Sequence, residues 1–545
     1  MVKLKRLIII ITAILLFIIL LLSNDKVNEN PIIQVLDKEN NEIALLNNKH
    51  ITNTININDL NETQINYIIQ IEDKDFYTHK GFSLKRIIKA TFTNIKNNEK
   101  QGASTITQQY VKNTYLNNNK TITRKLKEII LAIKIENKLT KDEILTEYLS
   151  SIYFGNNIYG LTNAAIYYYN KRIQDLTDYE LISLIALWNK PSVYSNNIEK
   201  WNNKTNIYLK KLGLSPCKIK LNLNKSYISS HKLYYIDEVI NELKKQKLEA
   251  NFGNKIIIKT AYNKKLEVIK TDKKIDYSLL IYDEAGYVAF CIGGKNYFEN
   301  SFNIATNSKR DIGSTIKPIL YYEAIKCGLK DQKFNSSPYS FNYKDSIATI
   351  TNSSGIYYGN INMKKALAVS DNIYATKMHN LLGYNTLVYH LKKYNIEAKP
   401  YPSLALGSVG MSLMELTNIY YQFFKNGLYV TPKFINEISI NNKTIKSKPQ
   451  TKQLLNKKIC EEIHNLLHAP FDVNIENSTC SSIQKNTKTT CYGKSGSTDY
   501  DSYLIGFTDS YLISCWCGTT NTYLTDKYLK RVPKELFLQA LNLLN

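Results

Sequence analysis

The segment from Gln101 to Lys112 reads Gln-Gly-Ala-Ser-Thr-Ile-Thr-Gln-Gln-Tyr-Val-Lys. Small and amide residues that lead into a predicted helix place hydroxyl, amide and unpaired backbone N–H groups together at its start. Such a helix start suits a phosphate or sugar ligand, because the N–H groups and the helix dipole both favour oxygen-rich groups. The side chains that we expect to contact such a ligand are Ser104, Thr105, Gln108, Gln109 and Lys112.

Two further polar segments flank this one. Upstream, residues 72–81 read Glu-Asp-Lys-Asp-Phe-Tyr-Thr-His-Lys-Gly, which fits a catalytic site but is also typical of a solvated turn. Downstream, residues 124–128 read Arg-Lys-Leu-Lys-Glu. Arg124 and Glu128 are predicted to lie together on one face of a helix, where the alternative is an ordinary exposed ion pair. The residues predicted to share the opposite, buried face are Leu126, Ile129, Ile130 and Ile133.

Apolar residues recur at helical spacing around these segments, so residues 30–200 are predicted to be mostly helical. The order and spacing of the polar segments resemble the glycosyltransferase domain of peptidoglycan polymerases, the murein-type family found in class A penicillin-binding proteins. Five motifs of that family are matched in order. The matching positions are Glu72, Asp73, Phe76, His79 and Gly81, then residues 102–109, then Arg124, Lys125 and Glu128, then residues 144–150 and residues 184–192.

The resemblance implies a lysozyme-like helical fold and one reaction. A sugar hydroxyl attacks an anomeric carbon that carries a lipid pyrophosphate, so a base must take the hydroxyl proton and cations must stabilise the departing diphosphate. By the resemblance, Glu72 is the base and Glu128 is a second carboxylate near the phosphate–sugar linkage. Asp73 and His79 are expected among the substrate-binding residues, and the matched or neighbouring cations are Lys112, Lys120, Arg124 and Lys125.

Two positions depart from the family pattern. Lys120 stands where the family usually has an arginine, so the charge is kept but the bidentate phosphate geometry is lost, and weaker activity is expected. Ser150 replaces the usual asparagine of the fourth motif. No dedicated metal motif is visible, so no metal site is predicted, and the resemblance leaves open whether a divalent cation, Mg²⁺ or Mn²⁺, assists glycosyl transfer.

The second half of the chain changes character. Residues 201–255 are rich in Asn and Lys and are predicted to be a linker with one helix near residues 237–246. From residue 256, strand-like runs alternate with helical stretches, which indicates an α+β arrangement. A serine and a lysine one helical turn apart can form an activated nucleophile, although alone the pattern occurs by chance in many chains. Three short motifs stand out, namely Ser314-Thr-Ile-Lys317, Ser370-Asp-Asn372 and Lys494-Ser-Gly496.

Together these motifs resemble the set found in serine β-lactamases and penicillin-binding transpeptidases. The resemblance implies acyl transfer, in which a stem peptide ending in D-Ala-D-Ala acylates Ser314 and releases D-Ala, and a neighbouring amine then takes the acyl group. Lys317 is the implied activating amine, and backbone N–H groups at Ser314 and Ser497 are the implied oxyanion hole. The other implied site residues are Ser370 as proton relay, Asn372 and Lys494 as substrate-positioning groups, and Ser495, Gly496 and Ser497 along the substrate strand.

The N-terminus carries an apolar run, Leu7–Leu22, of 16 residues without a charge. About 20 apolar residues span a bilayer, and flanking residues extend this run, so we predict a transmembrane signal anchor. Lys3, Lys5 and Arg6 should hold its N-terminal side in the cytoplasm. A cleaved signal peptide is the alternative, but no small-x-small cleavage site follows the run. The catalytic regions are therefore expected outside the cytoplasm, on a single-pass protein of the bacterial cytoplasmic membrane.

The charge balance is strongly basic. The chain has 545 residues, with 71 Lys and Arg against 47 Asp and Glu, which gives a formal net charge of +24. This charge points to an anionic partner, although an AT-rich genome would raise the Lys content in the same way. The expected location outside the cytoplasm makes nucleic acid a poor partner. None of the eight cysteines forms a CxxC pair, so no structural zinc site is predicted.

The predicted protein is therefore multidomain and bifunctional, a membrane-anchored peptidoglycan synthase. Its predicted parts are a cytoplasmic tip and anchor over residues 1–25, an all-α glycosyltransferase domain over 30–200, a linker over 201–255, and an α+β transpeptidase domain of the serine β-lactamase type over 256–545. The expected partners are lipid II and the nascent glycan strand, D-Ala-D-Ala stem peptides and β-lactam antibiotics, without nucleic acid. The residues around Ser314 lean toward the penicillin-binding protein 1C branch.

Three alternatives remain at this point. Departures at Lys120, Ser150, Ser495 and Tyr503 leave open a glycosyltransferase whose second domain only binds peptide. The literal Ser-Asp-Asn motif also suits a β-lactamase, which a fused polymerase domain argues against. A basic scaffold that binds wall polymer is the non-enzymatic reading, and it needs neither the two carboxylates nor the S-x-x-K motif.

Overall fold

The computed structural model describes residues 33–47, 50–52, 55, 57–83, 104–116, 121–156, 158–224, 230–246, 256–271, 275–297, 299–343, 345–441, 443–519 and 529–545. The predicted anchor over Leu7–Leu22, residues 101–103 and Lys120 lie outside these ranges. Within the described ranges, no helix has the length and apolar character needed to cross a bilayer.

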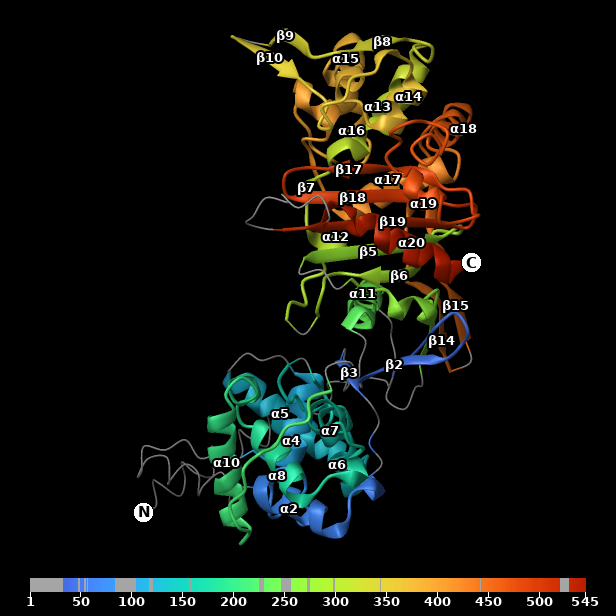
Figure 1. The fold of residues 1–545 in the computed structure, drawn as a ribbon. Coiled ribbons are helices and arrows are strands. Elements are labelled where there is room, and N and C mark those ends of the chain that lie inside the picture. Colours follow the sequence, from blue (N-terminus) through green and yellow to red (C-terminus); the bar gives the residue numbers. More distant parts are fainter. Residues whose placement is uncertain are drawn as a thin grey trace.

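The first domain is helical and occupies the lower half of Figure 1. Several of its helices begin where the sequence supplies a capping side chain. Thr105, Thr140 and Thr177 each accept a hydrogen bond from the backbone three residues on, and each is answered by a Gln or Glu side chain in a capping box. The helices are α2 (Glu62–Glu72), α4 (Ile106–Tyr115), α5 (Ile122–Glu136), α6 (Lys141–Ser151), α7 (Leu161–Tyr169), α8 (Asp178–Leu187), α9 (Pro191–Tyr194) and α10 (Ile198–Lys211), with 3-10 turns at Ile57–Asp59 and Ile173–Asp175.

This domain packs around its own core. Helix α8 contributes seven consecutive buried residues, Leu181–Leu187, and packs against α10, α2 and α7. Trp201 of α10 is buried among them, and its indole N–H donates to the Ser183 carbonyl over 2.7 Å. A helix segment that is apolar on every side is buried, so α8 from Leu181 onward lies in the core of the domain.

The second domain is built on an antiparallel sheet of five strands in the order β17-β18-β19-β5-β6. Strand β18 is buried along its whole length, so both faces of the sheet are covered, with α17 and α20 packed against the neighbouring β19. The sheet strands are β5 (Asp276–Asp283), β6 (Val288–Ile292), β17 (Tyr492–Ser497), β18 (Asp501–Phe507) and β19 (Tyr511–Gly518).

Helices and short two-stranded sheets complete this domain (Figure 1). The helices are α11 (Ser230–Lys245), α12 (Ile304–Asn307), α13 (Lys317–Lys326), α14 (Met363–Val369), α15 (Asn372–Leu382), α16 (Asn385–Lys392), α17 (Leu413–Phe424), α18 (Lys457–Leu466), α19 (Ser481–Gln484) and α20 (Val532–Leu544), with 3-10 turns η3 (Lys264–Val268), η4 (Gly313–Ile316), η5 (Pro402–Leu406) and η6 (Leu529–Arg531). The paired strands are β7 (Arg310–Asp311) with β12 (Gly410–Met411), β8 (Phe334–Ser336) with β11 (Gly359–Ile361), β9 (Tyr339–Tyr343) with β10 (Ser346–Ile350), and β13 (Leu428–Thr431) with β16 (Gln450–Gln453).

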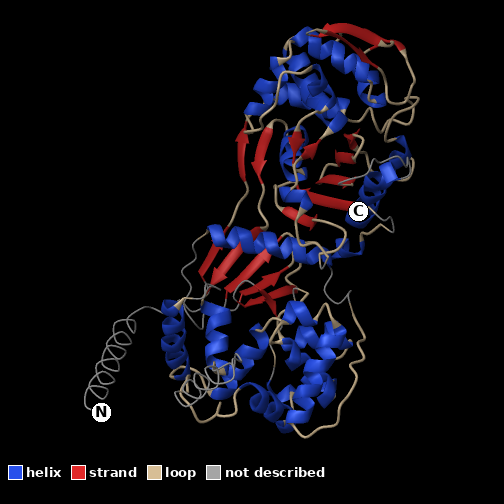
Figure 2. Cartoon of the chain, turned by 90° about the vertical axis from the view of Figure 1, so that its left-hand side faces the viewer, coloured by secondary structure: helices blue, strands red, loops and turns tan. Residues whose placement is uncertain are grey.

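A second sheet, of six strands, lies between the two domains in Figure 2. Its order is β15-β14-β4-β1-β2-β3, so it joins segments that are far apart in the sequence. Strand β1 pairs parallel with β4, and β14 pairs antiparallel with β4. The strands are β1 (Ile33–Leu36), β2 (Glu42–Asn47), β3 (His50–Thr52), β4 (Ile256–Thr260), β14 (Ile435–Ile440) and β15 (Lys443–Lys446).

This sheet corrects two predicted boundaries. The segments β1, β2 and β3 are strands and not helices, and the buried Val35 of β1 belongs to the core of the second domain. The region predicted as a linker, residues 201–255, contains the end of α10 on the first domain and α11 packed against β6 of the second. Strand β1 pairs with the neighbouring β2 on one side, but its partner on the other side, β4, begins more than 200 residues later in the chain. No local pattern in the sequence predicts this second pairing.

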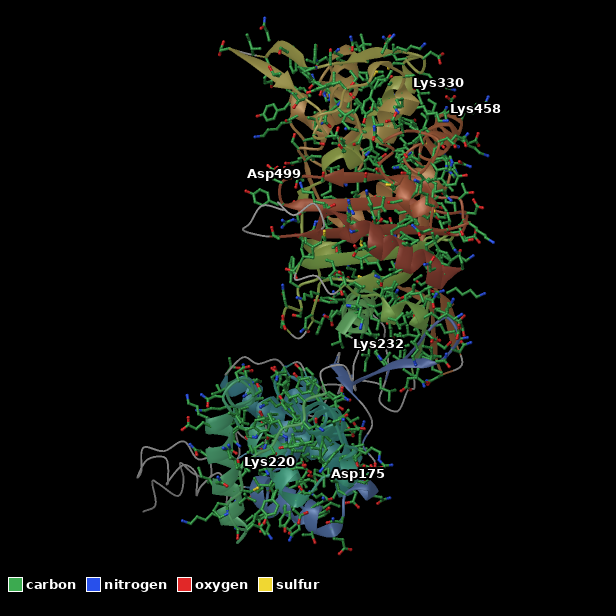
Figure 3. The ribbon with its side chains drawn as sticks, viewed as in Figure 1. Asp175, Lys220, Lys232, Lys330, Lys458 and Asp499 are labelled. Atoms are coloured by element: carbon green, nitrogen blue, oxygen red, sulfur yellow. The ribbon has the colours of Figure 1, made fainter. Side chains whose placement is uncertain are left out.

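Charged side chains cover the outer surfaces of both domains (Figure 3). Asp175 and Lys220 on the first domain and Lys330 and Lys458 on the second are all exposed. All eight cysteines are free thiols, and six of them are buried.

Candidate active sites

Glu72 is the last residue of α2, and its carboxylate is held by a side chain of α4. The amide Nε2 of Gln109 donates to Glu72 Oε2 over 3.1 Å, and the hydroxyl of Tyr148 donates to Gln109 Oε1 over 3.2 Å. Burial, reinforced by the negative charge of Glu72, raises the pKa of Tyr148 far above its usual value, so this phenol stays a neutral donor. The carboxylate of Glu72 is thus held in a chain of hydrogen bonds that runs through Gln109 to Tyr148.

The loop after Glu72 is tied to the start of α4. Asp73 is 1% exposed, and its Oδ2 accepts from His79 Nε2 and from the backbone N–H of Ile106, each over 2.9 Å. The backbone N–H of Gly81 donates to His79 Nδ1 over 3.1 Å, so the histidine proton is assigned to Nε2. The segment is therefore a turn that is solvated only in part, since Lys74 and Asp75 are exposed while Asp73 is buried. Asp73 and His79 fix the position of this loop beside Glu72.

The predicted helix-start residues divide into the buried Thr105 and Gln108 and the half-buried Ser104, Gln109 and Lys112. Thr105 Oγ1 accepts from the Gln108 N–H over 3.1 Å and donates to the Gly81 carbonyl over 2.7 Å, and Gln108 is buried. Thr105 and Gln108 therefore cap α4 and hold the loop. Ser104 lies at the outer end and accepts from Lys125 Nζ over 2.9 Å, which joins α4 to α5.

Glu128 lies on the buried side of α5 and forms ion pairs with two basic side chains. It is 1% exposed, Arg124 Nη1 donates to its Oε2 over 2.8 Å, and Lys125 pairs with its other oxygen. Burial lowers the pKa of Lys112, and the charges of Arg124 and Lys125 add to this effect, while Glu128 opposes it. The structure therefore brings Glu128 and three of the four predicted cations together.

The predicted buried face of α5 is confirmed only at Ile130, which is buried. Leu126, Ile129 and Ile133 are only partly buried, whereas Glu128, Ala132 and Ile135 are buried as well. Helical periodicity gives the direction of an apolar stripe, but it cannot reveal that a charged residue is buried with its partners. The alternative of an ordinary exposed ion pair at Arg124 and Glu128 is excluded by the same burial.

Helix α10 brings groups to Glu72 that the sequence did not single out. Burial lowers the pKa of Lys204, and the charge of Glu72 opposes this effect. The Lys204 ammonium lies 4.4 Å from the centroid of the Tyr208 ring, and Asn189 Nδ2 donates to the Tyr208 hydroxyl over 2.5 Å. One lysine in a lysine-rich helix carries no sequence signal, which is why it was missed.

Ser150, the departure in the fourth motif, has a structural place. It is buried, its hydroxyl donates to the Thr146 carbonyl over 2.8 Å, and it accepts from the Ile55 N–H over 3.3 Å. The side chain ties α6 to the segment that precedes α2.

The second candidate site lies where η4, the turn that carries the predicted nucleophile Ser314 and is called the nucleophile turn below, meets strand β17. Ser314 is in η4, which runs directly into α13, and Lys317 is the first residue of α13 and fully buried. Lys317 Nζ donates to the Ser370 carbonyl over 2.7 Å, to Ser370 Oγ over 3.3 Å and to Asn372 Oδ1 over 2.9 Å. The first two motifs therefore meet at one buried amine.

The third motif completes this cluster. Lys494 of β17 is buried, and its Nζ donates to Ser370 Oγ over 2.9 Å and to the Ser495 carbonyl over 2.6 Å. Burial lowers the pKa of Lys494 to about 7. Burial, together with the nearby charge of Lys494, holds the pKa of Lys317 well below its usual value. The hydroxyl of Ser370 thus connects two amines that can lose a proton at moderate pH.

A second layer of polar residues fixes the Ser370 turn. Ser370 adopts the left-handed conformation with φ 60°, and Asp371 caps α15 by accepting from the Tyr374 N–H over 2.7 Å. Asn352 Nδ2 donates to Asp371 Oδ2 over 2.7 Å, and Asn352 Oδ1 accepts from the Asn372 N–H over 2.8 Å. Asn352 was not predicted, because a single asparagine in an Asn-rich chain carries no signal.

Three glycines permit close approach around Ser314. A Cβ at Gly313 would lie 2.8 Å from the Ser497 carbonyl oxygen, and a Cβ at Gly496 would lie 2.9 Å from the Thr315 nitrogen. The backbone of β17 therefore lies against the nucleophile turn, with the backbone of Ser497 beside that of Ser314, as an oxyanion hole requires. On the other side, a Cβ at Gly407 would lie 2.0 Å from the Gly313 carbonyl oxygen.

Gly407→Ala should therefore displace the nucleophile turn. We expect covalent labelling by fluorescent penicillin to slow by about 100-fold, because a misplaced nucleophile loses its alignment. Gly383→Ala is the matched control, since both glycines have φ in the left-handed region, at +88° and +81°, but a Cβ at Gly383 meets nothing within 4 Å. Equal labelling rates in the two variants would show that the contact with Gly313 is unimportant.

The strand after the third motif is anchored by an ion pair. Arg310 pairs with Asp501, and the indole N–H of Trp516 donates to Asp501 Oδ1 over 2.9 Å. Tyr503 is buried opposite Gly496 on β17, so the departure at this position preserves an aromatic side chain under the site.

The described residues hold no group of three or more His, Cys, Asp or Glu side chains that could bind a metal ion. The carboxylate of Glu128 is already paired with Arg124 and Lys125 on its two oxygens, so it does not fit a resident Mg²⁺ or Mn²⁺ ion.

Comparisons with known proteins cover most of the chain. A family model described as Transglycosylase matches residues 39–213, and one described as Penicillin binding protein transpeptidase domain matches residues 278–503. Penicillin-binding protein 2D of Bacillus subtilis (strain 168) is 32% identical over 507 residues, which cover 85% of this chain and 73% of that protein. Penicillin-binding protein 1F of the same organism is 29% identical over 572 residues, covering 93% and 77%.

A solved structure has the same arrangement of domains. The crystal structure of penicillin-binding protein 1A from Haemophilus influenzae aligns with a TM-score of 0.55 at 14% sequence identity. The alignment covers 94% of this chain and 92% of that one, so the likeness extends over both domains and the sheet between them.

Proposed function

Because the chain belongs to the class A, bifunctional penicillin-binding proteins, we propose which of its residues carry out the two reactions of that family and where in the cell they act. The protein polymerises lipid II into glycan strands and cross-links stem peptides through a serine acyl-enzyme. The named relatives carry the branch names 2D and 1F, so the 1C branch stays a prediction.

In glycosyl transfer, Glu72 is the proposed base. It takes the proton from the attacking sugar hydroxyl, whose oxygen forms the new glycosidic bond as the bond to the lipid diphosphate breaks. Gln109 holds the Glu72 carboxylate by its 3.1 Å hydrogen bond. The cation cluster at Glu128 receives the negative charge that develops on the diphosphate, and its members are Lys112, Arg124 and Lys125.

In acyl transfer, the neutral amine of Lys317 takes the proton of Ser314. The serine oxygen attacks the carbonyl of the penultimate D-Ala, and the peptide bond to the terminal D-Ala breaks after its nitrogen receives a proton through Ser370. An amine of a second stem peptide then attacks the ester and regenerates Ser314. The pKa of Lys494 is about 7, so its amine is protonated below that pH and its positive charge then binds the substrate carboxylate.

The observation that carries this assignment is the convergence of Lys317 and Lys494 on the Ser370 hydroxyl, at 3.3 Å and 2.9 Å. A domain that only binds peptide has no need to bury two amines against one hydroxyl, because burying them lowers the stability of their charged forms. The alternative of a degenerate second domain is therefore not favoured.

We further propose that residues 7–22 anchor the protein in the bacterial cytoplasmic membrane, with both catalytic domains outside the cytoplasm. Support comes from the uncharged run and from Lys3, Lys5 and Arg6 before it. Lipid II is itself a membrane lipid, so an anchor keeps the polymerase at the surface that holds its substrate.

One experiment tests activity and location together. Carbonate-washed membranes that contain the full chain are given lipid II with or without penicillin. We expect glycan strands in both samples and peptide cross-links only without penicillin, because the acylated serine belongs to the other domain.

The location is tested with a chain that lacks residues 1–25, which should be released from the membranes into the carbonate wash. Loss of polymerisation with penicillin would contradict the assignment of separate sites, and a shortened chain that stays in the pellet would contradict the anchor.

A further inference from the structure

The hydrogen-bond chain at Glu72 ends on a tyrosine that lies outside the proposed set of site residues. The Gln109 amide nitrogen donates to Glu72 Oε2 over 3.1 Å, and the Tyr148 hydroxyl donates to Gln109 Oε1 over 3.2 Å. The three residues come from three different helices, α2, α4 and α6, so the packing of the domain brings them together. Tyr148 is thus linked to Glu72 through the amide of Gln109.

Tyr148 is held so that its hydroxyl has little freedom. The side chain is fully buried, and its ring packs edge-on against Trp188 with 5.6 Å between the ring centroids. Burial keeps the phenol protonated, because it raises the pKa of Tyr148 far above its usual value. Among the residues that the structure describes, only Gln109 accepts a hydrogen bond from this hydroxyl. The single phenol proton is therefore satisfied only while Gln109 presents its oxygen.

The hydroxyl of Tyr148 in this way selects one of the two orientations of the Gln109 amide. The two ends of an amide have similar shapes, but one end is an acceptor and the other is a donor. With the oxygen toward Tyr148, the NH₂ group faces Glu72 and stabilises the ionised carboxylate that a base requires. With the amide turned over, its oxygen would favour the protonated form of Glu72, and the phenol proton would lose its acceptor.

On the basis of the proposed role of Glu72 as base, we propose that Tyr148 is a positioning residue of glycosyl transfer. It keeps the NH₂ group of Gln109 turned toward Glu72, and so it keeps this carboxylate ionised until the sugar hydroxyl arrives. Tyr148 exchanges no proton in the reaction. The proton of the sugar hydroxyl moves to Glu72, and the phenol stays neutral throughout.

The other titratable groups near Glu72 are unchanged when the hydroxyl of Tyr148 is removed. Helix α10 brings Lys204 and Tyr208, whose pKa values both respond to the charge of Glu72, and the buried Asp73 follows Glu72 in the chain. Tyr148→Phe alters none of these groups and keeps the aromatic ring. A change in the pH dependence of polymerisation therefore reports the lost hydroxyl.

Polymerisation of lipid II by the full chain in detergent, measured over a range of pH, tests this role. In Tyr148→Phe the acid-side midpoint of kcat should rise by about one pH unit, since a hydrogen bond made to one protonation state alone is worth about tenfold. At a pH below both midpoints kcat should fall by about tenfold, while KM should change by less than about twofold. A general loss of folded enzyme would lower the rate equally at every pH.

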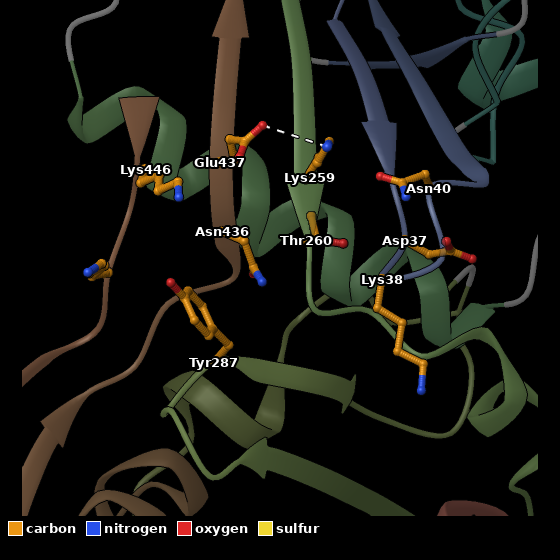
Figure 4. A pocket seen from close by; sticks show the side chains of 10 residues that line it. Asp37, Lys38, Asn40, Lys259, Thr260, Tyr287, Asn436, Glu437 and Lys446 are labelled. Atoms are coloured by element: carbon orange, nitrogen blue, oxygen red, sulfur yellow. Dashed lines mark ion pairs between the residues drawn. The ribbon is translucent and has the colours of Figure 1, made fainter. Parts of the chain in front are cut away.

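Two other tyrosines provide matched controls. Tyr168 of the same domain is buried, packs edge-on against Trp201 and donates to the Phe154 carbonyl over 2.9 Å, so Tyr168→Phe removes an equivalent hydroxyl outside the site. Tyr287 lies beside the six-stranded sheet between the domains (Figure 4), and its hydroxyl donates to the Ser447 carbonyl over 2.8 Å. Tyr168→Phe and Tyr287→Phe should both keep the acid-side midpoint of the wild type.

A double variant tests whether Tyr148 acts through Gln109. Gln109→Met replaces the amide by an apolar chain of similar length, so the phenol has no amide left to orient. Tyr148→Phe should then add less than about twofold to the loss caused by Gln109→Met, whereas two independent contributions would multiply.

The outcomes separate the role of Tyr148 from that of Glu72. A pH profile of Tyr148→Phe that matches Tyr168→Phe, or losses that multiply in the double variant, would overturn the role of Tyr148 while Glu72→Gln stays inactive in the same assay. A wild-type polymerisation rate in Glu72→Gln would instead overturn the assignment of the base on which this role rests.

Discussion

Ser314→Ala should abolish covalent labelling by fluorescent penicillin and abolish peptide cross-linking. Removal of a catalytic nucleophile typically costs about 10³-fold or more, because no other group can form the covalent intermediate. Lys317 would retain its hydrogen bonds to Ser370 and Asn372, so the rest of the cluster should keep its geometry. Labelling is read on a gel, and cross-links are read after digestion of the glycan.

The control for this variant is a serine on the same domain with no part in the site. Ser482→Ala removes the hydroxyl of an exposed residue of α19 and should label like the wild type. Ser314→Ala should also polymerise lipid II at the wild-type rate. Residual stoichiometric labelling in Ser314→Ala would assign the nucleophile to another residue.

Glu72→Gln should stop polymerisation of lipid II. The amide has nearly the same shape as the carboxylate, so the fold should survive, but it cannot accept the proton of the attacking hydroxyl. General-base catalysis typically contributes about 10²–10⁴-fold, and a loss in that range is expected. The rate is measured as the appearance of glycan chains from lipid II.

Glu62→Gln is the matched control for this variant. Glu62 is exposed in the first turn of the same helix, α2, so its substitution changes the charge of the helix without touching the site. Glu72→Gln should still be labelled by penicillin at the wild-type rate, which would show that the second domain is intact. A polymerisation rate equal to that of Glu62→Gln would remove Glu72 from the role of base.

The two chemical sites were predictable because their residues come in short motifs. Ser314 and Lys317 are one turn apart, so the sequence predicts their proximity, and the resemblance adds Ser370 and Lys494. The contacts of Lys317 and Lys494 with the Ser370 hydroxyl are tertiary and came only from the structure. Supporting residues such as Asn352 and Lys204 were missed, because each is a common residue type in a chain rich in Asn and Lys.

The organisation of the fold was less predictable. Strand β1 pairs with β4 across more than 200 residues, and neither strand is long enough to be recognised with its partner. Glu128 of α5 is buried although it was predicted on the exposed face, because ion pairs with Arg124 and Lys125 make such burial possible. Local periodicity depends on the spacing of apolar residues alone. It therefore predicts neither the burial of a charged residue such as Glu128 nor the pairing of strands that are far apart in the sequence.

The most direct test of a protein with two independent active sites is the muropeptide profile made from lipid II by the two single variants and the wild type, prepared in parallel. The account predicts cross-linked strands from the wild type, long strands without cross-links from Ser314→Ala, and unpolymerised lipid II with intact penicillin labelling from Glu72→Gln. Loss of penicillin labelling in Glu72→Gln, loss of polymerisation in Ser314→Ala, or cross-linked strands from Ser314→Ala would contradict it.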